Sequence, residues 1–182
     1  MNKSFMVISL LAVFALAPTT AQHHGQAQAQ GHHAAGNSSP YAGMQSRAIK
    51  ALSDEQIAAL KAGTGMALAM PAELNGYPGP SHTLEMASEL QLSQEQRTRT
   101  QQLFADMQAQ AKSAGDEVIE AERELDALFR DKKATPETVS SSVSKAAMAQ
   151  GKLRETHLRY HLAMLDVLTP EQVAAYSKLR GY

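Results

Sequence analysis

A helix-start signal occurs three times in this chain. Each copy reads Leu, then Ser or Thr, then two residues and Gln. The copies are Leu52-Ser53-Asp54-Glu55-Gln56, Leu92-Ser93-Gln94-Glu95-Gln96 and Leu168-Thr169-Pro170-Glu171-Gln172. This pattern predicts a capping box, in which the hydroxyl accepts a hydrogen bond from the third helical N–H and the Gln side chain accepts one from the cap N–H. Thr135-Pro136-Glu137 is a fourth start of similar kind. The boxes predict a helical body.

Two long segments carry apolar or small residues at alternating steps of four and three, the spacing of a heptad seam. In the first, from Ser93 to about Arg130, the seam is Leu103, Met107, Ala111, Ala114, Val118, Ala121, Leu125 and Leu128. In the second, from Thr135 to about Val167, it is Val139, Val143, Ala146, Gln150, Leu153, His157, Tyr160 and Met164. Because the link Asp131–Ala134 is short, the two helices are expected to form an antiparallel hairpin.

Shorter helices are expected from Ser53 to about Lys61, from Ser81 to Leu90 and from Thr169 to about Leu179, and no strand pattern appears. The predicted fold class is therefore all-α: an elongated antiparallel helical hairpin with additional short helices.

The first 21 residues are expected to be a secretory signal peptide. Lys3 precedes an apolar or small run from Phe5 to Ala17, and Pro18–Ala21 supplies a small-residue cleavage site. A membrane anchor is the alternative, but the run is too short to span a bilayer. Residues 22–40 contain no Leu, Ile, Val or Phe and are predicted to be a disordered His/Gln/Ala-rich tail, followed by a helical domain at 41–182. For a Gram-negative source, this predicts a periplasmic protein with no membrane span in its mature chain.

Charge and composition exclude several classes. The chain has 17 basic and 18 acidic side chains, which argues against a nucleic-acid partner. It has no Cys, which removes disulfides and thiolate metal sites. Gly63-Thr64-Gly65 lacks the Lys and the preceding strand of a phosphate loop. No arrangement of nucleophile and base appears, so no enzyme activity is expected.

The repeated Leu-Ser/Thr-x-x-Gln boxes, on a helical chain behind a signal peptide, resemble the LTXXQ-motif Spy/CpxP family of periplasmic chaperones and stress regulators. They are also similar to the related periplasmic heavy-metal sensor and resistance proteins. The motif residues are Leu52, Ser53, Gln56, Leu92, Ser93, Gln96, Leu168, Thr169 and Gln172. The resemblance implies a curved helical fold, a possible homodimer and no catalysis. Ser replaces Thr in the first two boxes, and the body is not strongly basic, unlike the best-known chaperone members.

A metal site is a second hypothesis, with Zn, Ni or Cu as the divalent ion and no cofactor required. His157 and His161 are four residues apart and share one helix face, and Met164 is one turn further. Hairpin geometry predicts Ala105 and Ala109 opposite these histidines, with Asp106, Met107 and Gln110 within reach. The alternative is a satisfied His157 in the seam and an exposed His161. His82, Glu85 and Met86 form another helical set, for which a solvated helix start is the preferred interpretation.

The tail holds a further candidate. Cleavage after Ala21 would leave Gln22-His23-His24 at the N-terminus, where the amine, two backbone amides and the His24 imidazole suit square-planar Cu(II) or Ni(II). His32 and His33 would add a looser capture point. A linker without any metal role is the favoured alternative, and cyclisation of Gln22 would abolish the array.

Three functions remain open from sequence. The first is a non-enzymatic chaperone or envelope-stress regulator that binds unfolded proteins or a periplasmic sensor domain on a helical cradle. The second is a metal-binding sensor or resistance protein that uses the histidines. The third is a structural helical module.

Overall fold

The computed structural model describes residues 39–182 of the chain. The elements in order are a 3₁₀ turn at Met44–Ser46, α1 (Asp54–Ala62), α2 (Met70–Glu73), α3 (Pro80–Glu85), α4 (Gln94–Arg130), α5 (Pro136–Met164) and α6 (Pro170–Arg180). No strand occurs in this described part, which confirms the all-α prediction. Within it, no helix is long and apolar enough to cross a membrane.

Four helices begin at a capping box. In α1 the Ser53 hydroxyl accepts from the Gln56 N–H at 3.2 Å, and the Gln56 side chain accepts from the Ser53 N–H at 2.8 Å. A reciprocal pair of the same geometry begins each of the other three helices: Ser93 with Gln96 in α4, Thr135 with Thr138 in α5, and Thr169 with Gln172 in α6. The leucine before each of the three predicted boxes is buried, as a residue that anchors a helix start should be: Leu52, Leu92 and Leu168.

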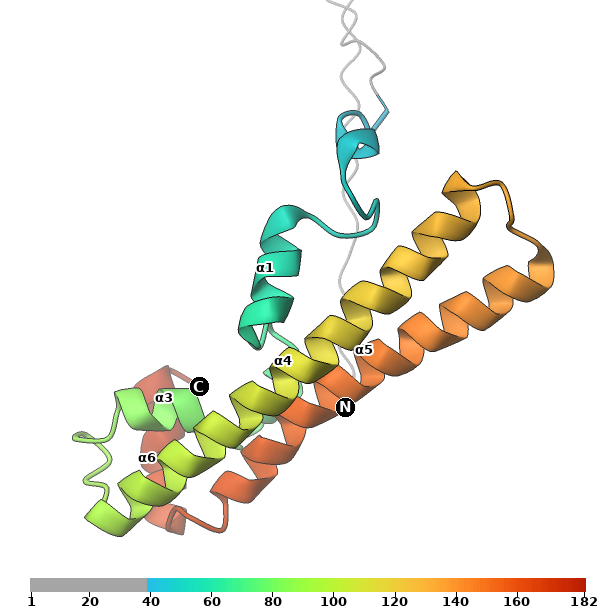
Figure 1. The fold of residues 1–182 in the computed structure, drawn as a ribbon. Coiled ribbons are helices and arrows are strands. Elements are labelled where there is room, and N and C mark those ends of the chain that lie inside the picture. Colours follow the sequence, from blue (N-terminus) through green and yellow to red (C-terminus); the bar gives the residue numbers. More distant parts are fainter. Residues whose placement is uncertain (1–38) are drawn as a thin grey trace, which may run out of the picture. The chain divides into compact units, whose positions relative to one another are not determined.

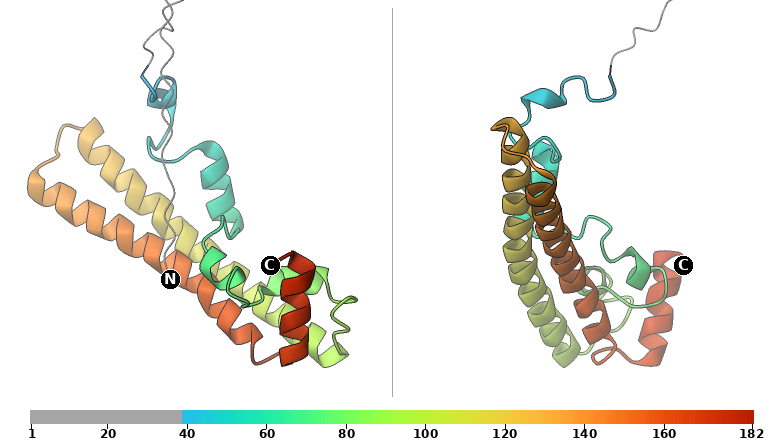
Figure 2. Two further views of the ribbon diagram at one scale, coloured as in Figure 1. Left: turned by 180° about the vertical axis from the view of Figure 1, so that it is seen from behind. Right: turned by 90° about the vertical axis from the view of Figure 1, so that its right-hand side faces the viewer.

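The long helices α4 and α5 run antiparallel and pack along their length (Figure 1). Ion pairs join them at Glu117–Lys152, with 2.6 Å between carboxylate and ammonium, and at Glu124–Lys145, with 2.5 Å. The short helices α1, α2 and α3 and the C-terminal α6 all lie on one face of this pair (Figure 2). The described domain therefore has two layers, and the outer face of α4 and α5 is bare.

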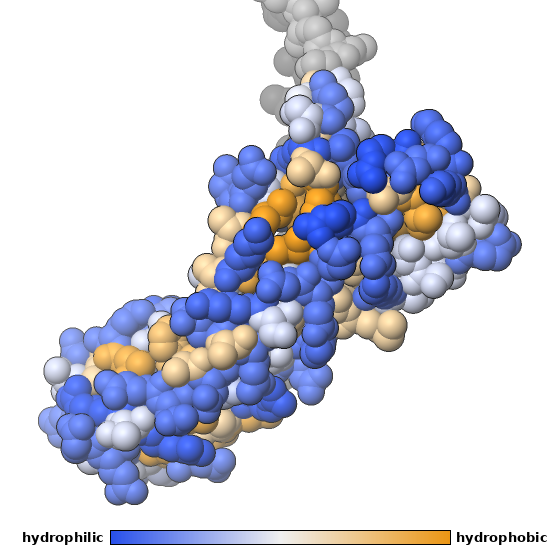
Figure 3. Space-filling view, viewed as in Figure 1, coloured by the Kyte–Doolittle hydropathy of each residue, from blue (hydrophilic) through white to orange (hydrophobic). Residues whose placement is uncertain are grey.

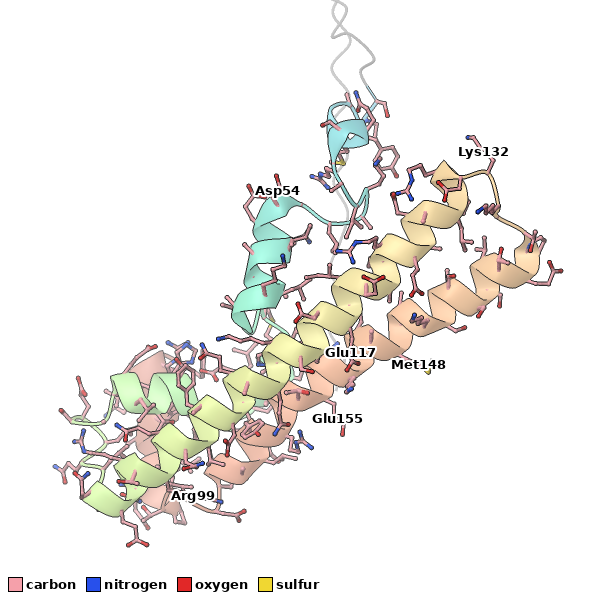
Figure 4. The ribbon with its side chains drawn as sticks, in the orientation of Figure 1. Asp54, Arg99, Glu117, Lys132, Met148 and Glu155 are labelled. Carbon is pink, nitrogen blue, oxygen red and sulfur yellow. The ribbon has the colours of Figure 1, made fainter. Side chains whose placement is uncertain are left out.

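The bare face is mostly hydrophilic (Figure 3). It carries exposed side chains such as Glu117, Met148 and Glu155 (Figure 4). A face with this composition needs no further layer to keep it from water.

Two apolar clusters lie where the second layer covers the α4–α5 pair. One joins α1 to the middle of the pair and includes Leu60, Ala111, Val118 and Leu153. The close approach of α1 depends on Gly115, because a Cβ at this position would lie 2.4 Å from the Leu60 carbonyl oxygen. The other cluster joins the segment before α4 to α6, and consists of Ala87, Leu90, Leu92, Leu103, Met107, Tyr160, Met164, Leu168 and Tyr176.

The predicted seam is buried over only part of its length. Its residues are buried from Leu103 to Ala121 and again from Ala146 to Met164, except for the half-buried Gln150, but Val143 is 48% exposed. The prediction that Val143 is buried is therefore wrong. The second layer does not reach the α4–α5 turn, and two helices alone cannot enclose a residue near their ends.

Two helix boundaries also differ from the prediction. The helix expected at Ser81–Leu90 is α3 at Pro80–Glu85, and the chain then turns, with Gln91 in the left-handed region at φ 51°. The Leu92 N–H donates to the Ala87 carbonyl at 3.0 Å, which closes this turn before the α4 cap. At the other end, α5 stops at Met164, and the Leu168 N–H donates to the Met164 carbonyl at 3.0 Å.

Candidate functional site

A pocket of about 660 Å³ opens between the two layers. Its floor is formed by α4 and α5, and its walls come from the 63–70 segment, α2, α3 and the C-terminal end of α6. This volume falls in the range of ordinary small-ligand sites. The pocket brings together segments that are up to about one hundred residues apart in the chain, so only the tertiary fold creates it.

The carboxylate of Glu73, at the end of α2, organises one wall. Glu73 is only 8% exposed. Its Oε1 accepts hydrogen bonds from the Tyr176 hydroxyl at 2.5 Å, from Arg180 Nε at 3.1 Å and from the Tyr182 hydroxyl at 3.4 Å. His82 Nδ1 lies 3.2 Å from the same oxygen. The buried charge is thus compensated by Arg180, and one carboxylate ties α2 to α3 and α6.

His161 reaches the same wall from α5. Its Nδ1 lies 2.7 Å from the Tyr77 carbonyl oxygen and 3.8 Å from Glu73 Oε2. Because a carbonyl oxygen only accepts, Nδ1 is the donor of this hydrogen bond. A Cβ at position 79 would lie 2.8 Å from His161 Cε1, so Gly79 leaves the room that the ring occupies.

His157 lies one turn before His161 on α5 and is 2% exposed. Its Nε2 is buried and has no hydrogen-bond partner. Burial lowers the pKa of His157, and the neighbouring His161 lowers it further. The ring is therefore held neutral, with an unused ring nitrogen, which in a native structure calls for an explanation.

The segment above His157 has an unusual backbone. A Cβ at Gly65 would lie 3.8 Å from His157 Nδ1, so this segment passes directly over the ring. The next two residues, Met66 and Ala67, both have positive φ angles, of 40° and 63°. Left-handed backbone at two consecutive non-glycine residues is uncommon, and such strain gathers at functional sites.

Methionine and other apolar side chains supply the rest of the lining. They come from the stretch around α2 and from α4, and are Met66, Met70, Leu74, Phe104 and Met107. Met66, Met70 and Leu74 are also between 41% and 54% exposed. The pocket therefore has an apolar mouth and a polar wall.

The residues predicted as a metal site are only partly brought together. His157, His161 and Met107 line the pocket. Met164 is fully buried in the apolar cluster beside α6. Asp106 is exposed and is not part of the lining; its charge contributes, after burial, to the raised pKa of Tyr160.

The register of the two long helices explains this difference. Gln110 Nε2 donates to the Tyr160 hydroxyl at 2.7 Å, and Arg159 donates to Gln110 Oε1 at 2.5 Å. The predicted register placed Ala109 opposite His157. These contacts instead place Ala109 opposite a position about one helical turn closer to the C-terminal end of α5. The segments beside α2 lie next to the histidines instead, with Gly65 beside His157 and Tyr77 and Gly79 beside His161.

Of the second predicted set, His82 is in the pocket lining, where it contacts Glu73. Glu85 is exposed and accepts from the Ser81 hydroxyl at 3.2 Å, and Met86 packs against the apolar cluster beside α6. Among residues 39–182, no group of three or more His, Asp or Glu is arranged to hold a metal ion. The tail candidates Gln22, His23, His24, His32 and His33 lie outside the described residues, as do the predicted signal peptide and nearly all of the predicted tail.

Sequence reasoning missed Glu73, the centre of the wall. One signal could have found it, because Glu73 is the only Asp, Glu, Lys or Arg between Lys61 and Glu85. An isolated acid in such a setting is buried only when it is paired. Its partners on α6 are about one hundred residues away, and no spacing rule predicts them.

The chain matches no family model, no curated protein and no solved structure. The resemblance to the LTXXQ-motif Spy/CpxP family therefore depends on the motifs alone and stays a prediction.

Proposed function

We propose that this chain is a non-enzymatic periplasmic binding protein of the Spy/CpxP kind, which holds exposed apolar segments of unfolded or signalling proteins. The observation that carries the proposal is the apolar pocket mouth. Met66, Met70, Leu74 and Tyr182 line the pocket, and each is more than 40% exposed. Exposed apolar side chains that gather around a cavity are typical of an interaction site rather than of a solvated surface.

The chemistry of this mouth suits varied clients. Methionine side chains are flexible and polarisable, and they adapt to partners of different shape. The bare face of the α4–α5 hairpin is less suited, because it is mostly hydrophilic and carries the Glu117–Lys152 pair (Figure 3). We therefore place client contact on the pocket side of the hairpin. For a Gram-negative source, the signal peptide predicted at residues 1–21 supports a location in the periplasm.

The test is suppression of aggregation of reduced α-lactalbumin, followed by light scattering at roughly stoichiometric amounts of this protein. Leu74→Lys and Met70→Lys are expected to lose most of the suppression, because a charge at the mouth repels apolar segments. Met148→Lys is the matched control, since Met148 is 70% exposed on α5, away from α2 and α3 (Figure 4). Equal suppression by all three variants would contradict the proposal.

A further inference from the structure

The Glu73 carboxylate lies in the lining of the pocket, and one of its two oxygens makes no hydrogen bond to the described residues. We propose that this oxygen, Oε2, binds the ammonium group of a lysine in the client, so that the preferred clients are apolar segments that contain a lysine. This inference rests on the client binding proposed above. It adds the chemistry by which the pocket selects one apolar segment over another.

The hydrogen bonds to Glu73 all end on the same oxygen. The polar groups within 3.4 Å of Oε1 come from α3 and from the C-terminal end of the chain, and are His82 Nδ1, the Tyr176 hydroxyl, Arg180 Nε and the Tyr182 hydroxyl. Among residues 39–182, no group donates to Oε2, because His161 Nδ1 is 3.8 Å away and donates to the Tyr77 carbonyl. A carboxylate oxygen accepts about two hydrogen bonds, so the capacity of Oε2 is unused.

Oε2 is also open to the pocket. Within the described residues, the buried side-chain atoms that lack a hydrogen-bond partner are Asp126 Oδ2 and His157 Nε2. Oε2 lacks a partner too and is not one of these enclosed atoms, so it keeps contact with solvent, and Glu73 lines the pocket. Gly79 contributes to this opening, because a Cβ at that position would lie 3.4 Å from Oε2.

A free carboxylate oxygen among apolar side chains favours a cation. An ammonium group forms a short, charge-assisted hydrogen bond to a carboxylate, and the low dielectric of an apolar pocket strengthens it. Arginine is less suited than lysine, because its planar fork binds both oxygens of a carboxylate and Oε1 is already occupied. Arg180 in the lining opposes a second cation, so the gain from the lysine is smaller than for an isolated ion pair.

The residues beside Glu73 suit the rest of such a segment. Met70 begins α2, Leu74 caps it, and both line the pocket. They are 51% and 54% exposed. The stem of a lysine packs on apolar surface while its charged end reaches a polar group. A client lysine can therefore place its ammonium at Oε2 while its apolar neighbours contact Met70 and Leu74.

The test measures the affinity of the secreted chain for three peptides by fluorescence anisotropy. Each peptide consists of leucine and alanine around one central residue, which is lysine, acetyl-lysine or norleucine. The N-terminus carries the fluorophore and the C-terminus is an amide, so the lysine is the only amine. The lysine peptide should bind about 5–20-fold more tightly than the acetyl-lysine peptide, because acetylation removes the charge and keeps the stem. The norleucine peptide measures the apolar contribution alone.

Two variants with the same change of net charge complete the test. Glu73→Gln should lose the preference for lysine and keep its affinity for the norleucine peptide, since the amide oxygen still accepts from Tyr176 but carries no charge. Glu155→Gln is the matched control, because Glu155 is exposed on the bare face of α5, and it should keep the preference (Figure 4). Circular dichroism checks that both variants fold. If Glu73→Gln does not fold, the three peptides on the wild type decide the question.

The outcomes separate this inference from the proposed function. Equal affinities of the wild type for the lysine and acetyl-lysine peptides would overturn the inference, and binding of the norleucine peptide would still support client contact at the mouth. A lysine preference that persists in a folded Glu73→Gln, or that disappears in Glu155→Gln, would overturn the inference as well. Failure of all three peptides to bind would overturn both proposals.

Discussion

Gln96 and Gln172 exchange two side-chain hydrogen bonds across the first turns of α4 and α6. Gln96 Nε2 donates to Gln172 Oε1 at 2.7 Å, and Gln172 Nε2 donates to Gln96 Oε1 at 3.1 Å. Each amide also caps its own helix and donates to a backbone carbonyl beside the other helix, at Val167 and Leu90. Both amides are therefore fully hydrogen-bonded, and the Gln of the motif joins two helices as well as capping one.

The bond between the two amides predicts that replacing the Gln of a capping box by Ala lowers the stability more in α4 and α6 than in α1. Gln96→Ala and Gln172→Ala should each lower the free energy of unfolding by about 1–3 kcal/mol, because each leaves the partner amide unsatisfied. Gln56→Ala loses only its own cap and should cost about 0.5–1.5 kcal/mol. Urea denaturation measures all three. The Gln96→Ala/Gln172→Ala double variant should lose less than the sum of the singles, and strict additivity would show that the two amides act independently.

Two glycines in long helices should respond to alanine with opposite signs. Alanine is usually the better helix former by about 1 kcal/mol, so Gly151→Ala in α5 should raise the stability, since nothing lies within 4 Å of the added Cβ. Gly115→Ala in α4 should lower it by about 1–3 kcal/mol, because the Cβ would lie 2.4 Å from the Leu60 carbonyl oxygen. Thermal unfolding of both variants checks the difference in sign. A stabilised Gly115→Ala protein would mean that α1 does not pack so closely on α4.

A buried charge should distinguish two valines of the predicted seam. Val118 is fully buried, and Val118→Asp should lower the free energy of unfolding by about 3–5 kcal/mol, the cost of an uncompensated buried charge. Val143 is 48% exposed, and Val143→Asp should cost no more than about 0.5 kcal/mol. Chemical denaturation of the two variants under the same conditions is the measurement. A large loss in Val143→Asp would indicate that the end of the hairpin is covered, for example by a second copy of the chain.

Alkaline pH should destabilise the fold through Tyr176. Burial raises the pKa of Tyr176, and its hydrogen bond to Glu73 raises it further. Above pH of about 10 the unfolded chain loses this proton while the folded chain retains it, so the free energy of unfolding falls as pH rises. Stability measured from pH 8 to 11 should therefore fall more steeply for the wild type than for Tyr176→Phe. In absorbance at 295 nm, the tyrosinate signal of Tyr176 should appear only with unfolding, and its appearance in the folded protein would contradict the assignment.

The sequence predicted the helix starts and the buried helix face correctly where these depend on residues close together in the chain. A capping box involves residues three apart, and Ser93 with Gln96 begins α4 as expected. The seam from Leu103 to Ala121 is buried because its spacing follows the helix period. Val143 differs because burial at that position depends on whether another layer covers it. The register of the hairpin also escaped prediction, since the length of the turn at Lys132, with φ of 57°, shifts every facing pair.

The sequence by itself determined the all-α class, the starts of the main helices and the presence of two neighbouring histidines on α5, because each depends on contacts within one or two helical turns. Only the tertiary structure decided what faces those histidines. Glu73 and Tyr77 lie beside His161, and Gly65 lies beside His157, because the segment from 63 to 82 folds over the hairpin, where Gly79 leaves space for the His161 ring. The pairing of Glu73 with Tyr176 and Arg180 spans about one hundred residues. Such contacts are set by how the layers pack, which no periodicity along the chain records.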